Sequence, residues 1–315
     1  MRVVLFGVMV LTLTTLARNT YSQGVQVSGG LDARYARPED GENHEPRLEG
    51  AFLNVRKVWT DAVGDRWIGV AQVDFDDNLQ TVRPYQVYLQ YKGPLGKWNV
   101  RAGHFLLPFG LLATHDTERL ILQGLEGVSL GLRKDTGAGV IGRFGAWDYA
   151  LTVTTGLGDT HIADRRANPV LTARMAYVRR DFQVGVSVLR GDLLIGHDAG
   201  TLSGNRLQER RFSVDATKSA SALNLRVEGT VGTDDGRTVG GGFVLADYAM
   251  SRDLEVNARA ASWSRRGNVW SGGLGVTYQI RPGLYFRAAE TYQSEGMFKN
   301  GYAIQFYYEF TKHVP

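Results

Sequence analysis

The chain of 315 residues contains no cysteine, and this absence limits how the chain can be stabilised. Without thiols it can form neither disulfides nor thiolate metal sites. After residue 16 it also lacks any apolar run near the roughly 20 residues that a membrane-spanning helix needs. These absences exclude a disulfide scaffold and a helical membrane protein.

The N-terminus has the pattern of a secretory signal. A basic start precedes an apolar run over residues 3–16, and small residues follow at Ala17 and Ser22. We expect a signal peptide over 1–22 and one mature domain over 23–315, because cleavage after Ser22 leaves the start just before the first patterned segment. Cleavage after Ala17 and an uncleaved anchor helix are the alternatives. The apolar run is short for an anchor.

The charge of the mature chain is close to balanced. The full chain carries a formal charge of +4, and removing Arg2 and Arg18 with the signal leaves 4 − 2 = +2. A balance this small gives no argument for nucleic acid as a partner.

Apolar and polar side chains alternate along most of the remaining sequence. The segments 25–35, 66–76 and 85–92 each place apolar side chains at every second position. This period of two is typical of strands with one apolar and one polar face. About sixteen such segments follow one another, each of roughly the length that a tilted membrane strand needs. The segment 238–250 alternates poorly.

The connections between these segments also alternate, between tight and long. Tight connections are expected at 61–65, 93–97, 145–146, 180–181, 251–253 and 281–283, and long ones at 36–46, 108–132, 157–169 and 191–209. Short turns at one end and long loops at the other describe an up-and-down barrel. The prediction is an all-β, transmembrane, antiparallel β-barrel of about sixteen strands in the outer membrane of a Gram-negative cell.

A soluble β-sandwich or propeller would also give many alternating strands. Against it, aromatic residues gather near the expected strand ends, where interfacial girdles lie in membrane barrels. The segment 301–310, GYAIQFYYEF, places five aromatic or aliphatic side chains on one face and resembles the terminal strand that outer-membrane assembly machinery recognises. It departs from that pattern because residues 311–315 follow Phe310. No blade-length repeat is present.

One apolar segment, GHFLLPFGLL at 103–112, interrupts the alternation. Pro108 cannot donate to a ladder and Gly110 permits a sharp change of direction, so a strand should end here. Gly103, Phe105, Pro108, Phe109 and Gly110 match the G-x-F-x-x-P-F-G pattern of the phosphate-selective porin family (porin O/P type).

This resemblance covers mainly residues 48–158. It implies a sixteen-stranded barrel, often trimeric, that passes anions and whose third long loop folds into the lumen. An external loop with an apolar base is the alternative. The residues expected to form a constriction are Pro108, Phe109, Gly110, His115, Asp116, Glu118 and Arg119.

Arginine recurs on the polar faces of the expected strands. The candidates for pore-lining residues are Arg34, Arg56, Arg101, Arg143, Arg174, Arg226, Arg259 and Arg287. Their planar donors suit phosphate or carboxylate oxygens. Carboxylates fall on the same faces, so a mutually compensating network is the alternative. Because lysines are sparse, phosphate specificity is the weaker expectation.

The predicted function is that of an outer-membrane porin. It would form a water-filled channel for passive diffusion of small hydrophilic solutes, with a preference for phosphate or other small anions, and would need no cofactor or metal. The histidines are scattered, and His115 beside Asp116 is the only adjacent pair. An enzyme such as an outer-membrane hydrolase would need a serine and a histidine projecting together, so we expect none. A barrel that serves as a sleeve or anchor around a partner protein remains the alternative.

Overall fold

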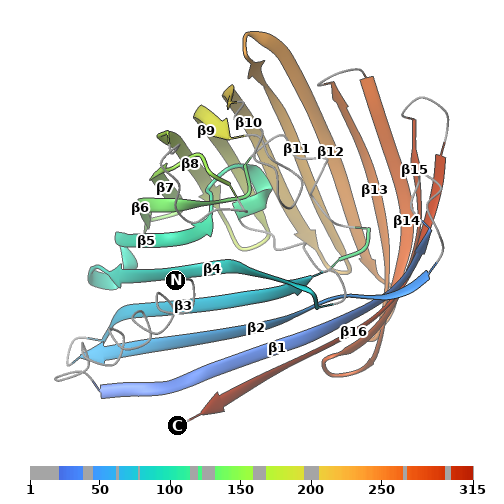
Figure 1. Cartoon of the computed structure of the whole chain (residues 1–315), viewed down its shortest axis with the longest axis horizontal. Coiled ribbons are helices and arrows are strands. Elements are labelled where there is room, and N and C mark those ends of the chain that lie inside the picture. Colours follow the sequence, from blue (N-terminus) through green and yellow to red (C-terminus); the bar gives the residue numbers. More distant parts are fainter. Residues whose placement is uncertain are drawn as a thin grey trace.

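The computed structural model of the chain describes residues 21–37, 45–61, 64–76, 79–113, 120–122, 132–158, 168–194, 206–264, 268–294 and 299–314. These residues form a closed antiparallel barrel in which each strand pairs with its neighbours in the sequence. The first and last strands pair with each other and close the wall (Figure 1). The expected signal peptide lies almost wholly outside the described residues.

Sixteen strands make up the described wall, as the alternation predicts. They are β1 Tyr21–Arg37, β2 Glu45–Asp61, β3 Gly64–Asp76, β4 Thr81–Lys92, β5 Asn99–Leu106, β6 Lys134–Phe144, β7 Trp147–Thr154, β8 Val170–Val178, β9 Phe182–Leu194, β10 Arg206–Ala220, β11 Leu223–Asp234, β12 Arg237–Ala249, β13 Leu254–Ser264, β14 Asn268–Arg281, β15 Leu284–Gln293 and β16 Lys299–Val314. Two short 3-10 helices, η1 Pro94–Gly96 and η2 Gly110–Ala113, lie between strands. Among the described residues, no helix is long and apolar enough to cross a membrane.

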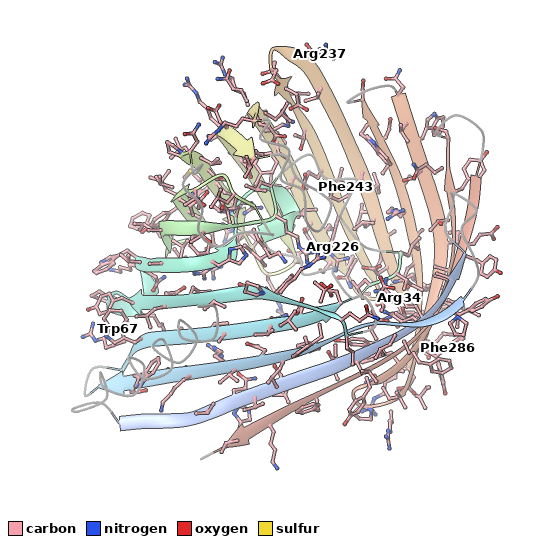
Figure 2. The ribbon with its side chains drawn as sticks, in the orientation of Figure 1. Arg34, Trp67, Arg226, Arg237, Phe243 and Phe286 are labelled. Atoms are coloured by element: carbon pink, nitrogen blue, oxygen red, sulfur yellow. The ribbon has the colours of Figure 1, made fainter. Side chains whose placement is uncertain are left out.

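The two faces of the wall differ in polarity. Along β9, Val184, Val186 and Val188 are exposed on the outside, whereas Ser187 and Leu189 between and beyond them are buried. Figure 2 shows Arg226 and Phe243 inside the space that the strands enclose and Phe286 outside it. An apolar exterior around a polar interior is the arrangement that a lipid bilayer selects for a barrel.

The strand ends sort into two sets, as expected from the connections. Tight turns at 145–146, 221–222 and 282–283 join strands at one end of the barrel, which also holds the start of β1 and the end of β16. The long connections, including the one between β5 and β6, are at the other end, which also holds the tight turn at 235–236 between β11 and β12.

The boundaries of some strands differ from the expectation. The last strand does not end at Phe310, because its ladder with β1 continues to the pair Val25 and Val314. Likewise, β9 and β10 pair with each other from Phe182 to Leu194, which shortens the long connection expected between them. In each case cross-strand pairing extends the strand beyond the segment in which side chains alternate.

The strand β12 explains why residues 238–250 alternate poorly. Its inward face carries Val239, Phe243 and Leu245, all nearly fully buried, where other strands carry polar side chains. Ala261 and Trp263 of β13 continue this surface. We call Val239, Phe243, Leu245, Ala261 and Trp263 the inner apolar patch. Apolar side chains inside a polar lumen need an apolar partner.

Candidate pore and its loop contacts

The G-x-F-x-x-P-F-G segment bends the chain away from β5. The strand ends at Leu106, and Leu107 N then donates to Arg133 O at 2.8 Å, so the two ends of the third connection meet. Gly103 has φ of +133°, and a Cβ there would lie 2.2 Å from the carbonyl oxygen of Val87. Gly110 has φ of +54°, and its Cβ would lie 2.3 Å from Glu228 Oε2. Both positions require glycine because other residues would clash and be strained.

The two apolar residues around Gly110 are anchored on separate parts of the wall. Phe109 packs against Val170 of β8 and Leu189 of β9. Leu111 packs against the inner apolar patch. Both side chains are almost completely buried, with 0% and 1% exposure. Leu111 therefore supplies the apolar partner that β12 and β13 need.

Two backbone hydrogen bonds hold the same turn. Gly110 N donates to Ser187 Oγ of β9 at 3.0 Å. Leu111 N donates to Glu228 Oε2 of β11 at 2.7 Å. The carboxylate of Glu228 is only 2% exposed, and Thr230 Oγ1 donates to its other oxygen at 3.3 Å. A hydrogen bond to a buried charged acceptor is among the stronger ones in proteins.

The described residues further along the connection contact another part of the wall. Leu122 is 3% exposed and packs against β14, where Gly273 and Gly275 leave room for its side chain. Leu120 lines an interior cavity of about 560 Å³ whose other lining residues include Phe52, Gln72, Thr277, Tyr285 and Arg287. The described parts of this connection thus contact inward-facing residues on strands far from β5.

Some of the expected constriction residues can be placed and others cannot. Pro108, Phe109 and Gly110 are buried in the contacts just described. His115, Asp116, Glu118 and Arg119 lie outside the described residues. The prediction that the whole third loop folds into the lumen therefore stays a prediction.

At least four of the eight predicted arginines form ion pairs with carboxylates in the described part of the chain. Arg34 NH2 lies 2.6 Å from Asp32 Oδ2, and Arg174 NH2 lies 2.5 Å from Asp215 Oδ1. Arg226 pairs with Asp247. In these pairs a carboxylate compensates the positive charge of the arginine. They therefore fit the alternative interpretation, in which arginines and carboxylates of the lumen form a mutually compensating network.

Arg143 is the fourth paired arginine, and it lies at the rim. It is two residues before the Gly145 turn, its side chain is 58% exposed, and it forms two hydrogen bonds with Asp148, one of them 2.7 Å long. An exposed, paired charge at a barrel end has little reach into the lumen, because solvent screens it.

Arg101 has neutral partners instead. Its guanidinium donates to Gln90 Oε1 at 2.8 and 3.0 Å and lies 4.3 Å from the ring centre of Tyr88. Within the described residues it forms no ion pair, and neither does Arg56 of β2. Arg101 and Arg56 therefore keep a full positive charge on the inward face.

Arg287 lies in a cage of aromatic rings and amides. The guanidinium carbon lies 5.1 Å from the ring centre of Tyr285 and 5.0 Å from that of Tyr307. Its NH1 donates to Gln305 Oε1 at 2.9 Å, and Gln305 Nε2 donates to Asp32 Oδ2 at 2.8 Å. This network ties β15, β16 and β1 together where the barrel closes. Arg259, the last candidate, is on β13 opposite Leu245.

Sequence reasoning missed Asp135, which organises the wall beside the third connection. Its side chain is fully buried and accepts hydrogen bonds from Thr155 Oγ1 at 2.9 Å and from Gly156 N at 2.6 Å. These bonds fix the chain as it leaves β7. The only signal in the sequence is a carboxylate directly after Arg133 and Lys134, which gives no hint of partners twenty residues away.

No protein-family model and no curated protein sequence matches the chain. Its structure is similar to several solved barrels. The trimer form of OmpT, an outer membrane protein of Vibrio cholerae, gives a TM-score of 0.70 at 12% identity, covering 92% of this chain and 100% of that one. The anion-selective porin from Comamonas acidovorans gives 0.68 at 11% identity, covering 91% and 100%. The outer membrane channel DcaP of Acinetobacter baumannii gives 0.65 at 12% identity, covering 93% and 98%.

The fold is that of the bacterial outer-membrane porins. At identities this low the likeness concerns the fold alone. The resemblance to one family of porins, the phosphate-selective O/P type, rests on the sequence motif at 103–110 and stays a prediction.

Proposed function

We propose that the chain is an outer-membrane porin, a water-filled channel through which small hydrophilic solutes diffuse passively. The observation that carries this proposal is a closed barrel with an apolar exterior and a polar, arginine-rich interior. The export pattern over residues 1–22 supports delivery to the outer membrane.

The third connection narrows this channel in our proposal. Phe109, Leu111 and Leu122 are anchored on inward-facing residues of strands that lie far from β5 around the barrel. In this proposal the segment attached at these points projects into the lumen. It would set the size limit for solutes, and residues 114–119 would then face the passage.

We propose a preference for anions because some positive arginine charges in the lumen have no carboxylate partner in the described part of the chain. Arg34, Arg174 and Arg226 have carboxylate partners, whereas Arg101 and Arg56 form no ion pair with the described residues. Two fixed positive charges on low-dielectric walls raise the local concentration of anions, so phosphate or other small anions are the favoured solutes. The similarity to an anion-selective porin supports this preference.

Two other roles are less well supported. A sleeve or anchor around a partner protein would need a lumen wide enough for that partner, which a channel narrowed by the third connection would not leave. An enzyme such as an outer-membrane hydrolase would need a serine and a histidine that project together from the wall, and the sequence gives no pattern that predicts such a pair. A homotrimer is our proposal for the assembly, by similarity to the trimer form of OmpT.

Liposome swelling tests the channel directly. Proteoliposomes that contain the folded chain should swell in isotonic solutions of small sugars and of salts of small organic anions, and the rate should fall as solute size increases. A barrel that acts as a sleeve or anchor gives no swelling above that of protein-free liposomes, and this result would contradict the proposal.

A further inference from the structure

Two arginines face each other on the outer surface of the barrel. Arg190 of β9 and Arg210 of β10 are direct cross-strand partners, and both side chains are exposed. They share a face with the preceding outward pair, Val188 and Phe212, which are 45% and 46% exposed. The arginine pair therefore points away from the lumen.

No described carboxylate forms an ion pair with either arginine. Arg210 NH2 donates at 3.4 Å to the neutral Gln208. The carboxylate of Asp192 is one outward position further along β9 and accepts a hydrogen bond from Asn168 Nδ2 at 3.0 Å. Like charges placed directly opposite across a ladder repel each other. An external anion would relieve this repulsion.

The pair lies at the boundary of the apolar band. On its short-turn side, the outward positions of β9 and β10 carry Val186, Val188, Phe212 and Val214. On its long-loop side, the next outward pair is Asp192 and Gln208. Long side chains at such a boundary extend their charges into the headgroup layer, where lipid phosphates lie.

Hydroxyl groups continue the same row of the sheet. Arg210 is opposite Thr233 of β11, and Thr233 is opposite Thr238 of β12. Two guanidinium groups can bind phosphate oxygens with paired hydrogen bonds, and a neighbouring hydroxyl can donate another. The row therefore offers several donors and no acceptor charge.

We infer that Arg190 and Arg210 form a binding site for a lipid with a phosphate monoester headgroup, in the membrane leaflet on the long-loop side. Its phosphate lies between the two guanidinium groups, and its acyl chains lie along the apolar positions below them. This site goes beyond the proposed channel function and requires only that the barrel is inserted in a membrane.

The test measures lipid binding to the folded full-length chain in detergent by native mass spectrometry. Phosphatidic acid is the probe, and phosphatidylcholine is the comparison lipid. The double variant R190Q/R210Q should bind phosphatidic acid at least about tenfold more weakly than the unmodified chain, because it loses its charge-assisted hydrogen bonds. Phosphatidylcholine should bind equally weakly to both.

The matched control changes two arginines at the opposite end of β9. Arg179 and Arg180 are exposed in the turn between β8 and β9, so R179Q/R180Q removes the same charge from the short-turn end. This variant should bind phosphatidic acid as the unmodified chain does. Equal losses in both variants, or a loss in neither, would overturn the site.

Two further results would also overturn it. Inorganic phosphate that binds as tightly as phosphatidic acid would show a site for free anions. A changed number of subunits in R190Q/R210Q would show a protein contact at this surface. Channel conductance should be unchanged in R190Q/R210Q, so a failed channel proposal is recognised separately from a failed lipid site.

Discussion

The partners of an arginine decide how far its charge reaches into the lumen. Arg101 lies against Gln90 and the ring of Tyr88, which are both neutral. Arg143 forms two hydrogen bonds with Asp148 and is largely exposed at the rim. The same residue type on the same face therefore acts as a free positive charge in one place and as half of a neutral pair in the other.

Charge reversal at these two positions should separate the two situations. We expect Arg101→Glu to shift the reversal potential in a salt gradient toward cation selectivity, because an uncompensated charge beside the passage changes sign. Arg143→Glu should cause a much smaller shift, because salt screens a rim charge beyond roughly 10 Å. Equal shifts would mean that charge at the barrel ends sets the selectivity.

Burial makes the Arg174–Asp215 pair the most sensitive of the ion pairs. The two side chains are only 6% and 0% exposed. Asp215→Ala would leave the arginine charge buried without its partner, which typically costs about 3–5 kcal/mol. Urea unfolding of the barrel in liposomes should show this loss, whereas Asp148→Ala, at the exposed pair, should cost about 1 kcal/mol or less. A similar cost for both would contradict a buried pair.

At the scale of elements, the turn after β5 packs its apolar side chain against the apolar inward residues of β12. The inward residues Phe243 and Leu245 pack against Leu111, which lies more than 130 residues earlier in the chain. Glu228 of β11 fixes the same turn through its backbone. Loop and wall therefore form one packed unit.

Loosening this unit should make the channel noisier. Leu111→Ala removes a buried side chain from the inner apolar patch, so the anchored segment should move more and the open-channel current should fluctuate more. Single-channel recordings would measure the current variance. Leu274→Ala is the control, since Leu274 is 66% exposed on the outer face. Equal variance in both variants would mean that Leu111 does not hold the segment in the passage.

Periodicity in the sequence predicted the strands well, because a strand with one apolar face must alternate. It also predicted the turn at Pro108 and Gly110, where backbone constraints are local. It did not predict that β12 needs Leu111, or that Asp135 binds the chain at Thr155 and Gly156, because such partners are set by the closed barrel. The pairing of the arginines was also out of reach, since it depends on the cross-strand neighbours, Gln90 for Arg101 and Asp148 for Arg143.

At the scale of the whole molecule, the barrel separates two environments. Its outer surface is an apolar band with a polar boundary at Arg190 and Arg210, and its inner surface is polar except where the third connection is anchored. A closed wall of this kind leaves the lumen as the route for polar solutes. In the proposed function, the segment between β5 and β6 sets the width of that route.

Single-channel conductance in planar bilayers, measured for the unmodified chain and for a deletion of residues 114–123, tests this account most directly. We predict discrete conductance steps for the unmodified chain and larger steps for the deletion, because removing the segment widens the passage. A correctly folded chain without steps would contradict the channel. Steps of equal size in both proteins would contradict its narrowing by the third connection.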